Sequence, residues 1–561
     1  MFVPWKSPRS DLRFFRLAKP LAALGICFFF SAPQIVFAQH EGHDAAMAGW
    51  VPAEILIRPV PLRKGIGSIH DPVTTSSPQA QSFYDQGLAY LHSYVWIEAA
   101  RSFHQALRLD PSCAMAYIGL SDAYVGLQDL SAANDAFAKA QALAANVGDA
   151  ERNRIAIRAA QLAYLASPQN TQLYFAYRKS LNDALAANPN DPWLWILLGF
   201  ASEGTPTAHG QNGGVETIAY YQTALALSPD NFVAHHYLIH SYETIGRTKE
   251  ALEHAKIYAQ MAPQVPHARH MFGHDLRRAG RTEEALAEFV KANELEDAYY
   301  RSENIPARFD WHHAHNLSLL AMCAQSLGKM KMAEDTYKAA FALPAYVDLS
   351  EYNRREWPGF LLHRNRPQEA LEAAKTMIEE SKHPLGRFAG HALAGRALLA
   401  LDRVDEAKAE LTLAERETEQ LPIAALSALP DAVMLRGEIL LRADKQTQGR
   451  ALLQQVEKQI RSVPGPDAWN GALFELESIA QSARKANDWE LAEFTAQQML
   501  QQDPSYAGSH YEAALVAQHR ADSATATTEF AAATKLWSSA DPTLPELALA
   551  KRSTSATPAS R

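Results

Sequence analysis

Histidines gather between residues 236 and 315 of this chain, at spacings that could bring several imidazoles to one ligand. Several of them lie three or four residues apart, which places them on the same face of a helix. Imidazole is a common ligand of zinc, copper, iron and nickel ions in proteins. The residues that share this pattern are His236, His240, His267, His270, His274 and His315. The pattern therefore predicts a site for a metal ion or another polar ligand.

Two pairs of histidines have the spacing that best suits a metal, namely His236 with His240 and His270 with His274. Side chains four residues apart on a helix have Cβ atoms about 5–6 Å apart, and neighbouring packed helices lie about 8–10 Å apart. The two pairs can therefore converge on one divalent transition-metal ion, zinc or copper, or on a close pair of ions. Glu243 lies on the same stripe and could act as a metal ligand, an orienting residue or a general base.

Other residues near this stripe are predicted to contact a bound ligand. His267 and His315 extend the row of imidazoles, Arg277 could bind an anion or a peptide carboxylate, and Trp193 would form an apolar wall. Simpler interpretations stay open, because arginines are often solvated surface residues and histidines are often ordinary surface or core residues. His235 lies on the packing side of its helix and is excluded from the site.

The helices that must position these residues follow from an internal repeat. Large and small side chains recur with the 34-residue period of the tetratricopeptide repeat (TPR), a pair of helices. One clear copy has Gly87, Tyr90, Ala99, Phe103, Ala106 and Pro111 at its signature positions. Because no repeat buries its apolar face alone, the sequence predicts an all-α solenoid, a right-handed superhelix of about twelve repeats. Contacts should join neighbouring repeats only, and no sheet is expected.

The register of the repeat places the histidines on one surface. On the first helix of a TPR pair, positions 2, 5, 9 and 12 form a stripe that lines the concave groove. His236 and His240 occupy positions 5 and 9 of one repeat, and His270 and His274 occupy positions 5 and 9 of the next. The predicted site therefore lies in the groove, where a protein or peptide partner would also bind.

The repeat pattern also sets the boundaries of the chain's segments. Four segments are predicted: a signal peptide at 1–38, an extended leader at 39–78, the TPR solenoid at 79–540 and a disordered tail at 541–561. The histidine-rich repeats span 232–347. Irregular interruptions at 203–216 and 297–313 flank them, and such interruptions are either functional loops or plain spacers.

The N-terminus predicts export. Five basic residues precede an apolar run that ends at Ala38, as in a cleaved signal peptide. Pro20 and Pro33 leave the run shorter than the ~20 residues of a membrane span, so we expect a periplasmic or secreted protein with no span after cleavage. Removing five basic residues and one acid from the 53 and 62 of the whole chain leaves a net charge of −13. Such a surface repels nucleic acid. Cys113 and Cys323 lie about six repeats apart, too far for a disulfide.

Over residues 65–345 the chain resembles a family of exported bacterial TPR proteins. The resemblance is carried by His236-Tyr237 with His240 and Glu243, by Pro266-His267-Ala268-Arg269-His270-Met271 with His274, by His315-Asn316, and by Phe83–Leu88 and Leu109–Ala116. Members of this family often have a proline after the His-Met pair and a second histidine after the His-Asn pair. Here those places hold Phe272 and Ser318. The resemblance implies a TPR fold and a histidine motif, with no established activity.

Three functions fit these patterns. The first is an exported binding or scaffold protein with a histidine-lined site for a metal ion or polar ligand. The second is a metal-dependent hydrolase with Glu243 as its base and residues 297–313 as a lid. The third is a protein-interaction scaffold in which the histidines are incidental. The sequence has no zincin HExxH, no GxSxG elbow, no Walker loop and no dinucleotide-binding glycine motif, which favours a function without catalysis.

Overall fold

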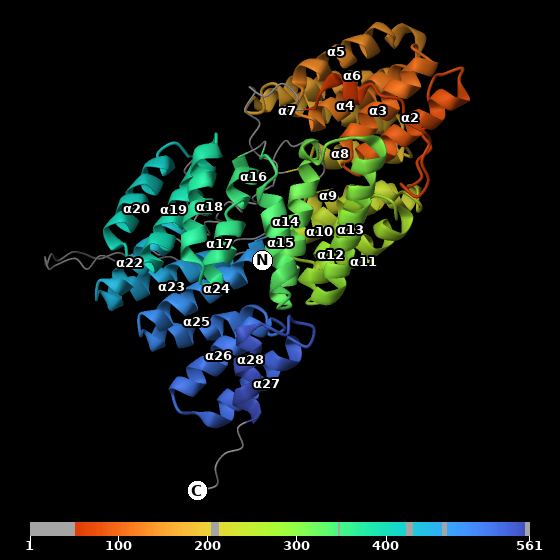
Figure 1. The fold of residues 1–561 in the computed structure, drawn as a ribbon. Coiled ribbons are helices and arrows are strands. Elements are labelled where there is room, and N and C mark those ends of the chain that lie inside the picture. The colour runs from red at the N-terminus through yellow and green to blue at the C-terminus, as the bar shows by residue number, and fades with distance from the viewer. Residues whose placement is uncertain (1–50, 204–212, 346–347, 422–429, 463–467, 556–561) are drawn as a thin grey trace, which may run out of the picture. The chain divides into compact units, whose positions relative to one another are not determined.

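The computed structural model describes residues 51–203, 213–345, 348–421, 430–462 and 468–555. Throughout these residues the regular structure is helical, and no strand occurs in them (Figure 1). The predicted signal peptide and most of the interruption at 203–216 lie outside them. No helix in the described part of the chain is long and apolar enough to cross a membrane.

Consecutive helices pack on one another in pairs joined by turns. The first seven pairs are α2 (Pro78–Leu91) with α3 (Trp96–Leu109), α4 (Ala114–Gly126) with α5 (Leu130–Ala142), α6 (Asp149–Leu165) with α7 (Thr171–Ala187), α8 (Pro192–Phe200) with α9 (Val215–Leu227), α10 (Phe232–Thr244) with α11 (Thr248–Met261), α12 (Pro266–Arg278) with α13 (Thr282–Glu303), and α14 (Trp311–Ser326) with α15 (Met330–Phe341).

The same arrangement continues through the second half of the chain. Its pairs are α17 (Glu356–His363) with α18 (Pro367–Glu380), α19 (Pro384–Ala400) with α20 (Val404–Thr418), α22 (Asp431–Arg442) with α23 (Gln446–Ser462), α24 (Ala468–Lys485) with α25 (Trp489–Gln502), and α26 (Ala507–His519) with α27 (Ser523–Leu536). The short helix α16 (Asp348–Asn353) precedes the first of these pairs. This succession of helical pairs confirms the predicted all-α solenoid.

Small residues at the signature positions let the two helices of a pair approach closely. Phe103 of α3 is fully buried, and a Cβ atom on Gly87 of α2 would come within 2.5 Å of its ring. In the pair α12–α13, a Cβ atom on Gly273 would lie 3.1 Å from the ring of Phe289. A side chain at Gly87 would therefore clash with Phe103, and one at Gly273 would require its neighbours to shift by a few tenths of an ångström.

The turn between α2 and α3 contacts repeats far along the sequence. His92 shares a hydrogen bond of 2.9 Å between its Nδ1 and the hydroxyl of Tyr237 in α10. Trp96 stacks on Trp311 of α14 with ring centroids 5.4 Å apart. The prediction that contacts join neighbouring repeats only is therefore wrong. The aromatic side chains of this turn are buried against α10 and α14, the first helices of distant pairs. A 34-residue period does not predict such contacts.

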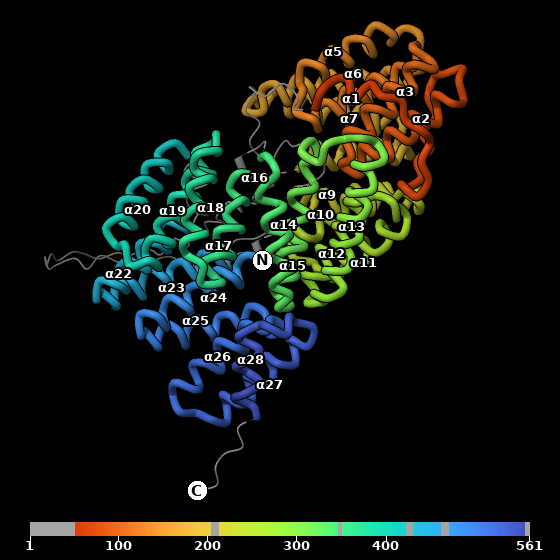
Figure 2. Tube along the Cα trace, in the orientation of Figure 1, coloured from red at the N-terminus to blue at the C-terminus, as the bar shows by residue number. Residues whose placement is uncertain are grey.

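The leader also crosses between distant repeats. Its short helix α1 (Ala53–Leu56) lies beside α3 (Figure 2) and buries Ile55 and Leu56. Further along, the carbonyl of Gly65 accepts a hydrogen bond of 2.8 Å from the backbone N–H of Gln264, just before α12. The leader thus ties the first pair of helices to the repeats that carry the histidines.

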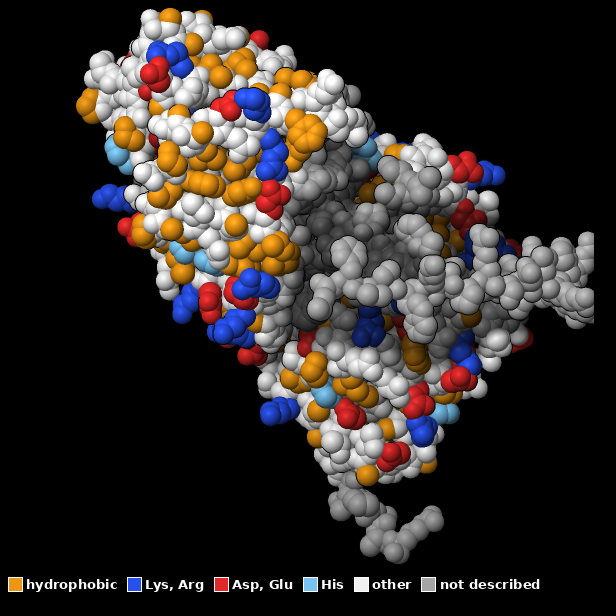
Figure 3. Space-filling view, turned by 180° about the vertical axis from the view of Figure 1, so that it is seen from behind, with side chains coloured by type: hydrophobic (Ala, Val, Ile, Leu, Met, Phe, Trp, Pro, Cys, Tyr) orange, Lys and Arg blue, Asp and Glu red, His pale blue; other side chains and the backbone are white. Residues whose placement is uncertain are grey.

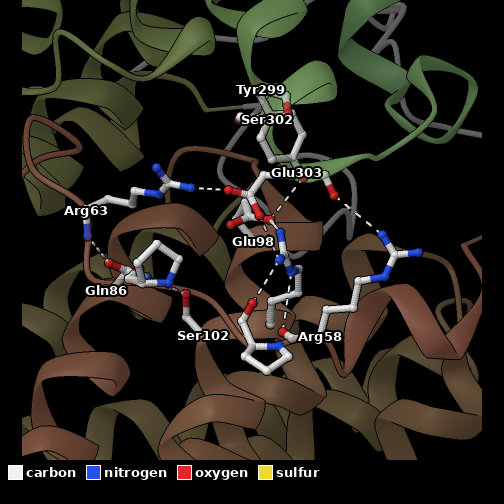
Figure 4. Close-up of polar contacts among 11 residues, drawn as sticks. Arg58, Arg63, Gln86, Glu98, Ser102, Tyr299, Ser302 and Glu303 are labelled. Atoms are coloured by element: carbon white, nitrogen blue, oxygen red, sulfur yellow. Dashed lines mark hydrogen bonds and ion pairs between the residues drawn. The ribbon is translucent and has the colours of Figure 1, made fainter.

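A polar network, drawn in Figure 4, fixes the leader and α3 to the end of α13. We call it the Glu303 network; its members are Arg58, Arg63, Glu98, Arg101, Tyr299 and Glu303. Arg101 donates to Glu303 Oε2 at 2.9 Å and pairs with Glu98. Tyr299 donates to Glu98 Oε1 at 3.1 Å. Because the side chains of Arg101 and Glu98 are 2% and 3% exposed, this is a buried ion network, in which loss of one partner is costly.

The segment from residue 297 to 303, expected to be irregular, is helical. Helix α13 continues to Glu303 and ends at Asn304, which has the left-handed φ of 49° that suits a helix C-terminus. A short 3₁₀ turn at Ala307–Phe309 then leads into α14. The contacts of Tyr299 and Glu303 in the Glu303 network stabilise the part of α13 from residue 297 to 303.

The C-terminal segment, expected to be disordered from residue 541, contains helix α28 (Pro545–Ser555). Leu547 and Ala550 are buried in a core that includes Trp537. The backbone N–H of Asp541 donates to the carbonyl of Gly328 at 3.1 Å, again between distant repeats. These buried apolar side chains and the backbone contact give the segment its order.

Candidate metal centre

Helices α10, α12 and α14 are the first helices of three successive pairs, and together they carry the histidines. Each begins where its sequence favours a helix start. Asn231 accepts hydrogen bonds from two backbone N–H groups of the first turn of α10, and Pro266 is the first residue of α12. Asp310 accepts a hydrogen bond of 3.0 Å from the backbone N–H of His312. These starts fix the register of the histidines on each helix.

Three imidazoles converge between α10 and α12, which we call the triad: His236, His240 and His267. Each of them offers one ring nitrogen, and the three nitrogens all lie within 4.8 Å of one another. The Nε2 atom of His236 is 3.0 Å from Nε2 of His267 and 3.2 Å from Nε2 of His240. Ligands bound to one tetrahedral zinc ion at 2.0–2.1 Å are about 3.4 Å apart. The triad is therefore already close to the spacing of metal ligands.

The second ring nitrogen of His236 shows which tautomer this residue adopts. Nδ1 of His236 lies 2.7 Å from the backbone carbonyl of His92, which can only accept, so this nitrogen carries the proton. Nδ1 of His240 faces a carboxylate oxygen of Glu243 at 3.4 Å. Nε2 of His236 is then left with its lone pair toward the centre of the triad, where it meets Nε2 of His240 and of His267. An outer partner on Nδ1 is the usual support of a metal-bound histidine.

Burial keeps the inner imidazoles neutral. His236 is 0% exposed and His267 is 5% exposed. Burial, and then the neighbouring imidazoles, lower the pKa of both rings well below the usual 6.5. His240 is the less buried member, and its side chain is 12% exposed. Neutral imidazole is the form that binds a metal ion.

Tyr94 covers the triad from the α2–α3 turn. Its ring centroid lies 4.6 Å from that of His236, 4.9 Å from that of His267 and 6.0 Å from that of His240. The backbone of Tyr94 has a left-handed φ of 58°. The concave face of these repeats was expected to be an open groove for a protein or peptide. In the structure the turn occupies it, so a partner would have to bind elsewhere on the groove.

A second group of histidines, His270, His312 and His315, lies on the side of α12 that faces α14. His270 lies close to His312 and His315, with ring centroids 4.6 and 4.7 Å away. His274 is held through Nδ1 by Glu243 at 2.7 Å. The structure therefore divides the predicted set of four metal ligands. His236 and His240 meet His267, which had been assigned to ligand contact, while His270 and His274 lie outside the triad.

Glu243 joins α10 to α12 as an orienting residue. It is 2% exposed and contacts His240, His274 and Arg278, the last at 3.4 Å. Burial raises its pKa, but the charge of His274 and hydrogen bonds from His240 and His274 outweigh burial and leave the pKa well below 4.5. A carboxylate engaged in this way is a weak base, which does not favour the hydrolase hypothesis.

Two other predicted residues lie away from the triad. Arg277 is 2% exposed and approaches Asp503, between α25 and α26, at 3.7 Å, so it joins distant repeats. Trp193 stacks on His92 with ring centroids 5.0 Å apart. It lines a cavity of about 90 Å³ with mainly apolar walls, next to the α2–α3 turn. His235, which had been excluded, contacts His254 with 2.7 Å between their Nδ1 atoms.

The sequence reasoning did not assign roles to four residues that the structure brings to the histidines, namely His92, Tyr94, Glu296 and His312. His312 and Glu296 are joined by a hydrogen bond of 2.6 Å. The adjacency of His312 to His315 on α14 was a usable signal. Glu296 precedes a segment that was predicted to be irregular. No local sequence pattern at His92 or Tyr94 indicates that they contact the histidines.

Comparisons with known proteins give a fold-level likeness. No protein family and no curated protein matches the sequence. A crystal structure of a TPR protein from Parabacteroides merdae is 15% identical, with a TM-score of 0.33, and the match covers 47% of this chain and 93% of that one. The apo form of the quorum sensor NprR from B. thuringiensis is 11% identical, with a TM-score of 0.42, over 69% of this chain and 98% of that one. Neither likeness transfers a function to this chain.

Proposed function

We propose that this protein is an exported TPR binding or scaffold protein that holds a divalent transition-metal ion, zinc or copper, on His236, His240 and His267. The observation that carries the proposal is the convergence of three imidazoles, whose ring nitrogens all lie within 4.8 Å of one another. Nε2 of His236 is 3.0 Å from Nε2 of His267 and 3.2 Å from Nε2 of His240. Because Nδ1 of His236 carries the proton, its Nε2 offers a lone pair at this centre.

The alternative to a metal ion is an ordinary hydrogen bond, in which Nε2 of His240 or His267 donates to Nε2 of His236. Burial lowers the pKa of His236 well below 6.5, so its ring is neutral near neutral pH. Neutral imidazole is also the form that binds a metal ion, so metal analysis distinguishes the two arrangements.

The class of metal follows from the ligands. Three imidazole nitrogens suit zinc and copper, whereas magnesium and calcium prefer oxygen ligands. Three protein ligands leave a fourth position for water, another side chain or a bound partner. Export is supported by the basic and apolar pattern of residues 1–38, and the net charge of −13 after cleavage disfavours nucleic acid as a partner. Protein partners would use the groove outside the region that the α2–α3 turn fills.

Elemental analysis of the purified, dialysed protein tests this proposal. We expect stoichiometric zinc or copper in the wild type and a loss of at least about tenfold in affinity for His240→Ala. His240 is the least buried member of the triad, so its replacement should leave the fold intact. His254→Ala removes an imidazole of the same repeat outside the triad and serves as the control. A wild type without metal, or a His240→Ala variant that binds as tightly as wild type, would contradict the proposal.

A further inference from the structure

The histidines between α12 and α14 have nearly the same arrangement as the triad. In the triad the three ring-centroid distances are 4.9, 5.0 and 6.2 Å. In the second group, formed by His270, His312 and His315, they are 4.6, 4.7 and 6.3 Å. Imidazoles that share one tetrahedral ion through Nε2 have centroids about 5 Å apart. The two groups are therefore alike in the spacing of their rings.

The tautomer of His270 is fixed by Asn316. The amide nitrogen of Asn316 donates to the backbone carbonyl of Phe289 at 3.2 Å, so its Oδ1 must face His270. That oxygen lies 3.0 Å from Nδ1 of His270 and can only accept. The proton of His270 is therefore on Nδ1, and its Nε2 carries the lone pair.

His312 has the same tautomer for a different reason. Its Nδ1 lies 2.6 Å from one carboxylate oxygen of Glu296. The other oxygen of Glu296 forms a hydrogen bond of 2.7 Å with Nδ1 of His313. His312 is 5% exposed, and its Nε2 is buried without a hydrogen-bond partner among the described residues. A buried nitrogen lone pair without a partner is unfavourable, and a bound metal ion would supply that partner.

We propose that His270, His312 and His315 hold a second divalent transition-metal ion beside the first, so that the centre is dinuclear. This rests on the proposed function, because the triad supplies the first ion. His267 joins the two positions, since its ring lies 5.0 Å from that of His312 and 4.9 Å from that of His236. α12 thus contributes one histidine to each ion, His267 toward α10 and His270 toward α14.

The second position needs a small adjustment to bind. Ring nitrogens of His270, His312 and His315 do not all lie within 4.8 Å of one another, as those of the triad do. The ring of His315 can turn toward the other two about χ2, which is a soft torsion in histidine, while His270 and His312 keep their Nδ1 partners. We therefore expect the triad to fill first and the second position to bind more weakly.

Zinc and cobalt titrations of the metal-stripped full chain test the inference. The measurement is the number of ions bound per chain, from elemental analysis after gel filtration and from cobalt absorption. We expect two ions in the wild type, one in His312→Ala and one in His236→Ala. His313→Ala is the matched control, because His313 neighbours His312 and shares its carboxylate but lies outside the second group, so it should retain two ions.

The outcomes separate the two proposals. A wild type that binds one ion, lost in His236→Ala and kept in His312→Ala, leaves the proposed function standing and overturns the second ion. One ion lost in both variants means a single shared site and also overturns it. A wild type that binds none overturns both. Helix content by circular dichroism identifies a variant that fails to fold, in which case His312→Gln, which keeps a polar side chain, replaces it.

Discussion

Removal of the Glu303 carboxylate should loosen the α2–α3 turn from the metal centre. Glu303 lies at the end of α13 and accepts a charge-assisted hydrogen bond of 2.9 Å from Arg101. Arg101 follows the α2–α3 turn on α3, and its side chain is 2% exposed. The Glu303→Ala variant leaves this buried guanidinium with Glu98 as its remaining carboxylate partner in the network.

The size of the effect follows from burial. Breaking a buried ion pair by removing one partner costs about 3–5 kcal/mol. The lower end applies, because the side chain of Glu303 is 12% exposed and Arg101 keeps Glu98. A loss of about 3 kcal/mol corresponds to an increase of about 150-fold in the population in which the turn is detached.

Amide hydrogen exchange by mass spectrometry measures this population directly. Peptides that cover residues 88–104 should exchange about 100-fold faster in Glu303→Ala than in the wild type. Glu288→Ala is the matched control on the same helix. Its carboxylate pairs with Arg269 at 3.3 Å with side chains 20% and 16% exposed, so we expect a change of at most about 1 kcal/mol. Equal exchange in the two variants would refute the view that the Glu303 network holds the turn in place.

Three further predictions concern other parts of the chain. Gly87→Ala should lower stability by about 1–3 kcal/mol in thermal unfolding, because its Cβ would lie 2.5 Å from the buried ring of Phe103; an unchanged Tm would show that α2 and α3 have room to separate. Burial raises the pKa of Glu457 from 4.5 to about 7. Between these two pH values the Glu457 carboxyl is protonated in the folded protein and ionised in the unfolded chain, so Glu457 lowers the stability of the fold as pH rises through this range. Glu457→Gln should therefore raise the Tm at pH 8 by the equivalent of about 2–3 kcal/mol and leave it unchanged near pH 4.5; an equal gain at both pH values would contradict this. Adding zinc at about 100 times its Kd should stabilise the stripped protein by about 2.7 kcal/mol, and His236→Ala/His240→Ala should lose the part of this gain that comes from the triad.

The fold followed from the sequence where the controlling contacts are local. The spacing of Gly87 and Phe103 within one repeat reflects the packing of two consecutive helices, and the structure has that packing. The same spacing says nothing of contacts between distant repeats. The stacking of Trp96 on Trp311 therefore could not be predicted from the period, nor could the order of α28.

The candidate site was predicted in outline for the same reason. The register placed His236 and His240 on one face of α10, where their ring nitrogens meet. Which residue of α12 would join them depends on how far one helix is shifted along the other, and repeat spacing does not supply that shift. His267 lies opposite His236, and His270 lies on the side of α14. Tyr94 covers the site from a turn that is more than 140 residues from α10 in sequence. His92 of this turn and His236 of α10, which are in contact, are 144 residues apart.

The central claim, that the triad binds a metal ion, is tested most directly by X-ray absorption on the protein loaded with one equivalent of zinc. We predict a first shell of nitrogen ligands at about 2.0–2.1 Å with the outer-shell scattering of at least three imidazoles. His240→Ala/His312→Ala lacks a ligand of each position, so in this variant that scattering should fall by one imidazole, while His254→Ala should match the wild type. A first shell of oxygen ligands, or a spectrum that is the same in His240→Ala/His312→Ala and the wild type, would contradict the claim.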